Sequence, residues 1–320
     1  MEKTRQLPAI NIIVPLYNEE ESFDDLTKRL INLMEGSVLN IEVLLVDDGS
    51  MDRTAFLMKQ LSLVDTRFQS IFLSRNFGHQ LALSAGLKYT NAREAVLIID
   101  GDLQDPPELL AQFYPYLNQG YDVVYAVRSS RESSFFLKLA YHAFYRIMKR
   151  FSYINIPLDS GDFSLISRRV VNKMNDMPEE SRFLRGIRSW VGFKQIGIPF
   201  NRESRRNGNS KYGLGKLIGL ALNGIFNFSK YPIRLTMMLG ITALSTSLVY
   251  FLITLFKKIF IGDVPTGFTA LLFVVILFGG LQLIAIGIIG EYILRIFFQV
   301  KNRPLYIVSE RIQYGIQLED

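Results

Sequence analysis

Residues 95–107 read AVLIIDGDLQDPP, an apolar run that ends in acidic residues and two prolines. A run that is apolar on both sides predicts a strand covered on both faces, as in the parallel sheets of α/β proteins. Parallel strands are joined by helices, and amphipathic stretches separate the apolar runs of this chain. The runs cover residues 10–14, 42–46, 70–73, 95–99 and 122–127, and the helical patterns begin near Glu20, Asp52, His79 and Pro106. Residues 1–203 therefore predict an α/β domain with a mostly parallel sheet.

The composition fits a folded protein without thiol chemistry. Of the 320 residues, 49% are hydrophobic, which excludes disorder over most of the length. The absence of cysteine removes disulfides, thiolate metal sites and cysteine nucleophiles, and it suits a reducing compartment. With only His79 and His142 as histidines, carboxylates are the remaining metal ligands, and they suit Mg²⁺ or Mn²⁺. The net charge of +6 is too modest to indicate a nucleic-acid partner.

Two apolar segments, residues 235–256 and 268–290, lie near the C-terminal end and contain no Asp, Glu, Lys, Arg or His. Each is long enough to cross a bilayer core of ~30 Å at ~1.5 Å per residue. Globular helices rarely stay apolar on every face over such a length, so we predict a transmembrane hairpin with an extracytoplasmic loop at residues 257–267. Lys and Arg number seven on the outer flanks against two in the loop. This asymmetry predicts a multi-pass protein of the inner (cytoplasmic) membrane, with residues 1–203 and a C-terminal tail at 291–320 in the cytoplasm.

Residues 204–234, just before the first span, are basic and amphipathic. This pattern predicts an interfacial helix that leads into the membrane. A similar stripe over residues 135–151 fits core packing and an interfacial helix equally well. The charged N-terminus does not read as a cleavable signal peptide.

Polar side chains follow the first two strands at the point where each ends. Residues 14–20 read VPLYNEE and residues 46–54 read VDDGSMDRT. Alone, each segment is typical of a turn. Together they bring an aromatic ring and several carboxylates to neighbouring strand tips, where open α/β sheets bind their ligands. These groups suit stacking on a base and hydrogen bonding to ribose, so we predict a nucleoside site.

The fourth strand ends in Asp100-Gly101-Asp102. Residues i and i+2 of a strand share a face, so the two carboxylates can converge on one hard cation. Asp105, which precedes two prolines, fits a helix cap, but capping is a poorer account of Asp100 and Asp102. A divalent ion there would bridge a diphosphate and neutralise the charge that develops on it as a leaving group.

These motifs, with SRNFG at residues 74–78, occur in the order and at the spacing of a known family. The chain resembles a family-two, GT-A-type glycosyltransferase of the polyprenyl-phosphate branch, and is similar to the GtrB-like glucosyltransferases and the dolichyl-phosphate mannose synthases. The motif GDF at 161–163, the segment RRNGNSKY at 205–212 and the two spans extend the resemblance over essentially the whole chain. It implies a Rossmann-like GT-A catalytic domain with a membrane anchor.

The resemblance implies a role for single residues. The nucleoside of the donor would be held by Pro15, Tyr17, Glu19, Asp47 and Asp48, with Arg75 near the base or the diphosphate. Asp100 and Asp102 would form the metal site. His79 stands where relatives often carry lysine, so we expect a structural or donor-edge contact from it rather than a catalytic role.

A lipid phosphate would be bound between the catalytic domain and the bilayer. Paired Arg and Lys donors suit that phosphate, although a basic patch attracted to anionic lipid is the alternative. The candidate residues are Arg205, Ser210, Lys211 and Tyr212. Arg185, Arg188 and Trp190 resemble the acceptor-side segment of the family, with a helix that has a solvated basic face as the alternative.

The expected reaction is a single inverting displacement, in which a lipid phosphate oxygen attacks the anomeric carbon and the nucleoside diphosphate leaves. A phosphate monoester with a second pKa of about 6 is largely dianionic at neutral pH, so a strong base is less necessary. Asp159 and Asp162 are the candidates for a base or an acceptor-orienting residue, and a turn-and-cap role fits Asp159 equally well.

UDP-glucose is the favoured donor, with UDP-N-acetylglucosamine, GDP-mannose and a modified arabinose donor as alternatives, and undecaprenyl phosphate is the favoured acceptor. Two spans do not translocate the product, so we expect a separate flippase. Small residues in the second span suit close packing and a homo-oligomer: Gly279, Gly280, Gly287 and Gly290. A processive polysaccharide synthase is disfavoured because Arg188-Ser189-Trp190 interrupts the Gln-x-x-Arg-Trp pattern of such enzymes. A membrane-anchored nucleotide-binding scaffold without chemistry is the alternative from another class.

Overall fold

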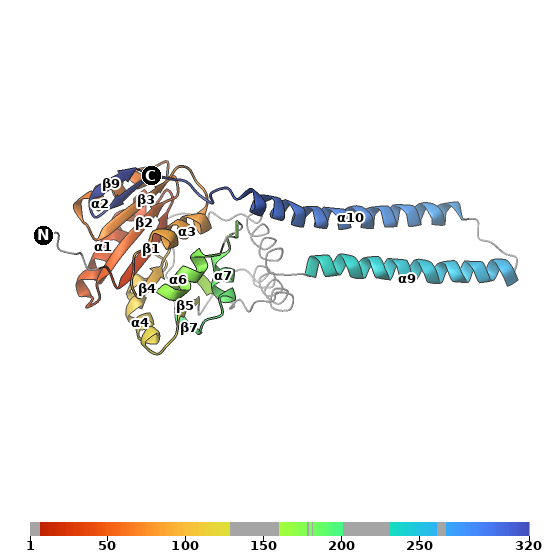
Figure 1. The fold of residues 1–320 in the computed structure, drawn as a ribbon, viewed down its shortest axis with the longest axis horizontal. Coiled ribbons are helices and arrows are strands. Elements are labelled where there is room, and N and C mark those ends of the chain that lie inside the picture. The colour runs from red at the N-terminus through yellow and green to blue at the C-terminus, as the bar shows by residue number, and fades with distance from the viewer. Residues whose placement is uncertain are drawn as a thin grey trace. The chain divides into compact units, whose positions relative to one another are not determined.

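The computed structural model describes residues 7–128, 160–177, 179–180, 182–200, 231–260 and 267–319. The described residues up to 200 and from 303 onward belong to one compact unit, and those from 231 to 302 belong to a second. Figure 1 shows the sheet and its helices in the first unit and the long helices α9 and α10 in the second.

A nine-stranded sheet forms the centre of the first unit, in the order β7-β5-β6-β4-β1-β2-β3-β8-β9. Neighbouring strands are parallel except where β6 meets β4 and β5, and where β8 meets β3 and β9. The strands are β1 Ile10–Leu16, β2 Ile41–Asp47, β3 Phe68–Leu73, β4 Ala95–Ile98, β5 Val123–Arg128, β6 Ser160–Ser167, β7 Gln195–Phe200, β8 Val308–Gln313 and β9 Ile316–Glu319. This confirms the predicted α/β class with a mostly parallel sheet.

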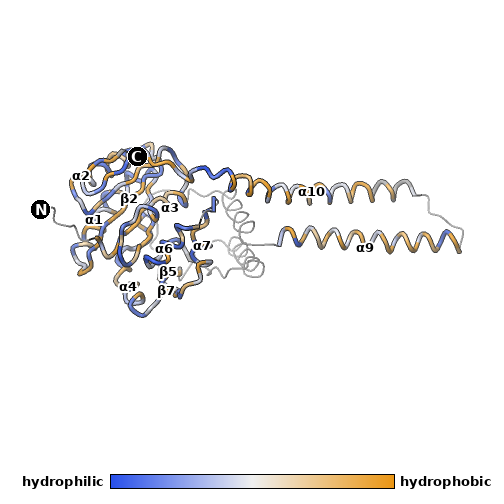
Figure 2. Tube along the Cα trace, viewed as in Figure 1, coloured by the Kyte–Doolittle hydropathy of each residue, from blue (hydrophilic) through white to orange (hydrophobic). Residues whose placement is uncertain are grey.

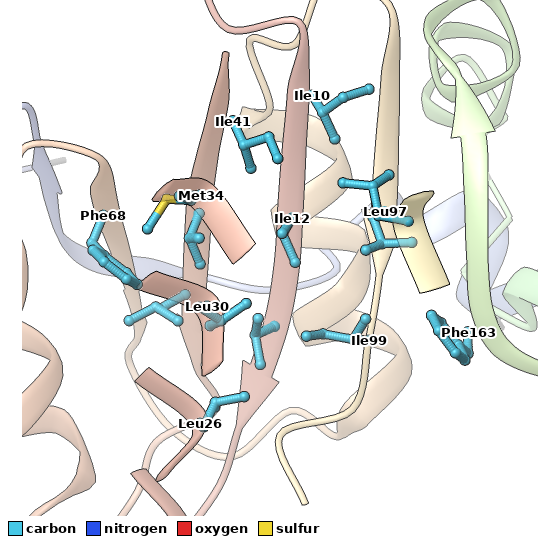
Figure 3. Packing of buried hydrophobic residues seen from close by; sticks show 14 of the residues in the cluster. Ile10, Ile12, Leu26, Leu30, Met34, Ile41, Phe68, Leu97, Ile99 and Phe163 are labelled. Atoms are coloured by element: carbon cyan, nitrogen blue, oxygen red, sulfur yellow. The ribbon is translucent and has the colours of Figure 1, made fainter. Parts of the chain in front are cut away.

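Helices cover both faces of the sheet. They are α1 Glu20–Gly36, α2 Thr54–Val64, α3 His79–Tyr89, the 3₁₀ turn η1 Pro107–Leu109, α4 Leu110–Asn118, α6 Arg168–Asn175 and α7 Leu184–Trp190. All seven residues of β1 are buried, and Ile10 and Ile12 belong to the hydrophobic cluster that also contains Leu26 and Leu30 of α1 (Figure 3). Ile13 points to the opposite face, where it contacts α3. The alternation along β1 explains why its run is apolar throughout.

The last two strands come from the far end of the chain. β8 pairs with β3 antiparallel, and its Ile312 is buried. Residues 291–320, expected as a C-terminal tail, instead continue helix α10 to residue 301 and then supply β8 and β9. The long apolar helices are therefore flanked in sequence on both sides by residues of the same compact unit.

The second unit contains helices α9 Tyr231–Phe260 and α10 Phe268–Lys301, which contact each other. Figure 2 shows that apolar residues predominate along both. Each is long and apolar enough to cross a membrane, and the apolar windows bury nothing within the described structure, unlike the core helix of a soluble protein. Each helix extends beyond its predicted apolar segment. At ~1.5 Å per residue, each is longer than a bilayer core of ~30 Å.

Candidate active site

The loops that follow β1 and β2 are joined by reciprocal hydrogen bonds. The Asn18 N–H donates to Ser50 Oγ (3.0 Å), and the Met51 N–H donates to Asn18 Oδ1 (2.8 Å). Asn18 adopts a left-handed backbone conformation (φ 53°), which Asn tolerates better than most residues. The Glu19 N–H donates to Thr54 Oγ1 (2.9 Å), so the starts of α1 and α2 are connected as well. The two predicted nucleoside motifs are thus joined by hydrogen bonds.

Asp47 and Asp48 lie at the tip of β2, as predicted, and each is only 3% exposed. The Asp47 carboxylate accepts the Ser50 N–H (3.2 Å), whereas Asp48 accepts the N–H groups of Phe77 (2.7 Å) and Gly78 (2.9 Å). Burial raises the pKa of both carboxyl groups, and these hydrogen bonds oppose that rise. Within the structure, Asp47 and Asp48 shape the loops around the predicted nucleoside site.

The loop at residues 74–78 packs directly against the loop after β2. Gly49 has φ 69°, and a Cβ there would come within 2.4 Å of the Arg75 carbonyl carbon, so only glycine allows this approach. Arg75 is exposed, and its guanidinium lies 4.0 Å from the centre of the Phe77 ring. Arg75 is therefore exposed on a loop that borders the predicted donor site.

The remaining donor candidates differ in exposure. Pro15 is buried within β1, whereas Tyr17, the next residue but one, is 37% exposed. Glu19 is partly buried and accepts a hydrogen bond from Ser22 Oγ (3.1 Å). Among these three residues, Tyr17 presents a ring that suits stacking on a base.

Asp100 and Asp102 follow β4 in a turn that packs on the end of β1. A Cβ on Gly101 would lie 2.4 Å from Leu16 Cδ2, so glycine permits this contact. Asp105, which we predicted as a helix cap, accepts the Asp100 N–H (3.4 Å).

The acidic pair fits a divalent ion that is shared with a substrate. Among the described residues, no group of three or more His, Asp or Glu side chains could hold a metal. Mg²⁺ is commonly bound by one or two carboxylates together with substrate phosphates and water. Asp100 and Asp102 supply hard oxygen donors of that kind.

His79, to which the sequence analysis assigned no catalytic role, bridges the two acidic parts of the site. Its Nε2 lies 3.5 Å from Asp100 Oδ1 and 3.6 Å from Asp162 Oδ2. Burial opposes the charged ring, but the hydrogen bond to Asp162 and the charge of Asp100 outweigh it and raise the pKa of His79 to about 9. His79 is the first residue of α3 and directly follows the SRNFG motif. Helix N-termini that follow a strand often face a ligand, so this position could have indicated a role in the site.

Asp162 is held by two further side chains. Arg185 donates to both of its oxygens, from Nε at 3.0 Å and from Nη2 at 3.2 Å. Gln80 Nε2 donates to Oδ2 (3.0 Å), and Gln80 Oε1 in turn accepts the Leu184 N–H (2.9 Å). Burial would raise the pKa of Asp162, but Arg185 and His79 outweigh it and hold the pKa well below its usual range. Asp162 is thus an ionised anchor for its neighbours.

Helix α7 carries the three predicted acceptor-side residues, which differ in exposure. Arg188 is 2% exposed, and its guanidinium lies 5.3 Å from the centre of the Tyr125 ring. Burial lowers the pKa of Arg188 to about 10. Trp190 is 53% exposed, and Arg185 binds Asp162. The alternative of a solvated basic face therefore does not hold for Arg188.

Several predicted residues lie outside the described part of the chain. They are Asp159 and the acceptor-phosphate candidates Arg205, Ser210, Lys211 and Tyr212, together with the amphipathic stripe at 135–151 and the interfacial segment before residue 231.

Acidic loops at the carboxyl ends of a mostly parallel sheet are the arrangement of a GT-A-type glycosyltransferase, the class that the motifs predicted. The model of the family described as "Glycosyl transferase family 2" matches residues 11–174, about half of the chain. The chain belongs to glycosyl transferase family 2, and the predicted enzyme class is confirmed.

Relatives match nearly the whole chain. The uncharacterized glycosyltransferase YkcC of Bacillus subtilis (strain 168) is 42% identical over 96% of this chain and 94% of its own length. The SfII prophage-derived bactoprenol glucosyl transferase of Shigella flexneri is 36% identical over 94% of this chain and 97% of its own length. The prophage bactoprenol glucosyl transferase homolog of Escherichia coli (strain K12) is 35% identical, over 94% and 98%. These relatives confirm the resemblance to the GtrB-like glycosyltransferases.

Proposed function

We propose that this chain transfers one sugar from a nucleotide sugar to the phosphate of a polyprenyl phosphate, with inversion at the anomeric carbon. The favoured substrates are UDP-glucose and undecaprenyl phosphate. The observation that carries this proposal is the 36% identity to a bactoprenol glucosyl transferase over 97% of that relative's length. Two long apolar helices agree with an acceptor that is itself a membrane lipid.

Mg²⁺ or Mn²⁺ is the proposed cofactor, held by Asp100 and Asp102. When bound, the ion supplies positive charge that stabilises the departing nucleoside diphosphate. The other donor contacts belong to the joined loops: Tyr17 stacks on the base, and Arg75 directs its charge toward the diphosphate. Asp47, Asp48 and Glu19 keep these loops in place, and Pro15 supports them from within β1.

The acceptor side of the proposal centres on Asp162. Its carboxylate accepts hydrogen bonds from Arg185 and Gln80 and faces His79, so it orients these side chains. A lipid phosphate that arrives as a dianion needs alignment more than deprotonation. We propose Arg185 and Trp190, with Asp159 and the segment around Arg205 and Lys211, as the residues that align it.

We further propose that α9 and α10 cross the inner membrane as a hairpin, with the catalytic domain in the cytoplasm. Both ends of this hairpin continue into one compact unit, and a hairpin of two crossings returns the chain to the side where it started. We also propose that the chain forms a homo-oligomer and that a separate flippase moves the product across the membrane.

A donor panel tests the reaction. Purified protein, undecaprenyl phosphate and Mg²⁺ are incubated with radiolabelled UDP-glucose, UDP-N-acetylglucosamine, GDP-mannose or UDP-arabinose derivatives, and the organic-extractable lipid is counted. We expect label from UDP-glucose that disappears with EDTA and in the Asp102→Ala variant. Label from a different donor would replace the proposed sugar, and nucleotide binding without any labelled lipid would favour the non-catalytic scaffold.

A further inference from the structure

The start of β8 borders the loop that carries Arg75. The Ser74 N–H, at the first residue of that loop, donates to the Ile307 carbonyl (2.9 Å). Ser309 Oγ donates to the Phe72 carbonyl (3.0 Å) two residues earlier. The pairing of β3 with β8 changes register here, because Phe72 faces Glu310 whereas Leu73 faces Val308. Ser309 is the additional residue of this irregularity, and such bulges redirect the chain at the end of a strand.

Side chains of β8 contact α2, α3 and the hydrophobic core of the catalytic domain. Lys59 Nζ of α2 lies 2.8 Å from Glu310 Oε1, and the Arg311 guanidinium lies 4.6 Å from the centre of the Tyr89 ring at the end of α3. Ile312 is 1% exposed and belongs to the main hydrophobic cluster. The strand is therefore a stable support rather than a loosely attached end.

The loop at residues 74–78 is thus held from two opposite ends. At its C-terminal end, Asp48 accepts the N–H groups of Phe77 and Gly78. At its N-terminal end, Ser74 is bound by Ile307. Arg75 projects between the two attachment points and is exposed. Residues 303–313 lie well beyond residue 174, where the match to the family model ends.

We propose that residues 303–313, which follow the second apolar helix, are a positioning segment of the donor site. They hold the start of the 74–78 loop, so Arg75 meets the donor diphosphate from a loop that is already ordered. Without them the loop must be ordered when the donor binds, and that cost appears as weaker donor affinity. The inference rests on the proposed glycosyl transfer for the identity of the ligand, a nucleoside diphosphate sugar.

Two variants test this role in the full-length protein. Ser309→Ala removes the hydroxyl that binds Phe72, and Ser309→Thr retains a hydroxyl. Ile316→Ala, on the exposed edge strand β9, is the matched control. We measure the affinity for UDP and for GDP by titration calorimetry, and the KM for nucleotide sugar and for lipid phosphate separately. We expect Ser309→Ala to weaken donor affinity about threefold, as for the loss of one neutral hydrogen bond, with the lipid KM unchanged and Ser309→Thr close to wild type.

A second experiment deletes the segment from the chain and then adds it back as a separate peptide. A chain that ends at Asn302 should lose about tenfold or more in nucleotide affinity, and a synthetic peptide of residues 303–320 should restore it in trans by pairing with β3. Restoration also shows that the truncated chain is folded.

Unchanged nucleotide affinity in Ser309→Ala and in the truncated chain, or an equal rise of both KM values, would overturn the inference. A failure of the proposed function looks different. In that case nucleotide affinity still depends on residues 303–313, but no donor yields a labelled lipid.

Discussion

At the residue scale, the His79 ring lies between the proposed donor and acceptor parts of the site. It lies between Asp100, a proposed metal ligand, and Asp162, which is bound to Arg185. A cation at this point balances two carboxylates that would otherwise repel each other. The ring therefore carries a charge at neutral pH, when free histidine is mostly neutral.

The raised pKa of His79 predicts a particular dependence on pH. Because its folded pKa of about 9 exceeds the ordinary value of 6.5, the charged ring stabilises the fold fully below pH 6.5, and this contribution is lost as the pH rises through about 9. The chain has only two histidines, so ring NMR signals of metal-free protein can be assigned with His142→Gln. We expect the His79 signal to titrate near pH 9, and titration near 6.5 would contradict the geometry.

Asp162 is predicted to act as an anchor rather than as a free base. Asp162→Asn leaves Arg185 without its buried counter-ion, so we expect a loss of about 3 kcal/mol in the free energy of unfolding together with lower kcat. Chemical denaturation and kcat are measured on the same preparation. Lost activity at unchanged stability would instead indicate that Asp162 takes a proton from the acceptor.

At the scale of elements, Asp122 ties together three parts of the sheet at the start of β5. Its N–H donates to the Lys194 carbonyl before β7, and its own carbonyl accepts the Ser167 N–H at the end of β6, both at 2.8 Å. The carboxylate accepts hydrogen bonds from Ser167 Oγ (2.9 Å) and from the Arg169 guanidinium at the start of α6. One residue thus joins β5 to β6, to the start of β7 and to α6, on the side of the sheet that carries Asp162.

This corner predicts acid sensitivity. Burial opposes ionisation, but Arg169 and Ser167 outweigh it and hold the pKa of Asp122 below its ordinary value of 3.8. A lowered folded pKa stabilises the fold above that value, and the contribution is lost as the pH falls below about 4. We expect Asp122→Asn to flatten this part of the stability profile. Ser167→Ala removes only one of the groups that lower this pKa and leaves Arg169 in place, so we expect it to flatten the profile less. An unchanged pH slope in Asp122→Asn would contradict this role.

The sequence predicted those elements whose own residues form an apolar run or an amphipathic pattern. β1 to β4 are apolar runs buried on both faces, and α1 and α3 begin at the expected residues Glu20 and His79. β8 reads VSERIQ, which shows no such run. Among the described strands it pairs with β3, more than 200 residues away, and with the short β9. A strand that completes an edge through distant pairing leaves little trace in its own sequence.

The site was predictable to a similar extent. The motifs located Tyr17, Asp48, Arg75 and Asp100 at neighbouring strand tips, as the parallel sheet requires. They did not indicate that Asp48 holds the loop at 74–78, or that His79 and Arg185 meet at Asp162. These contacts join residues from about 20 to about 80 positions apart along the chain, and no local pattern specifies such pairings.

At the scale of the whole molecule, the catalytic domain contains residues from both sides of the helical hairpin. Because β8 follows α10 and pairs with β3, the ends of the hairpin must lie on the same side of any membrane that it crosses. The excess of Lys and Arg on the outer flanks predicts that this side is the cytoplasm.

The absence of cysteine makes the topology directly measurable. Single-cysteine variants Val38→Cys in the catalytic domain, Ile316→Cys in β9 and Lys258→Cys at the end of α9 are exposed to a membrane-impermeant maleimide in intact cells. We expect labelling of Lys258→Cys alone, and labelling of all three after the cells are opened. Labelling of Ile316→Cys in intact cells would contradict the hairpin.

Analysis of the product of one reaction tests single-sugar transfer to a lipid phosphate most directly. Purified protein is incubated with UDP-glucose, Mg²⁺ and either undecaprenyl phosphate or undecaprenol, which lacks the phosphate, and the lipid is analysed by mass spectrometry alongside the released UDP. We predict one hexose on undecaprenyl phosphate, one UDP for each glycolipid, and no reaction with undecaprenol. UDP released without a glycolipid, or a lipid bearing a sugar chain, would contradict single-sugar transfer to a lipid phosphate.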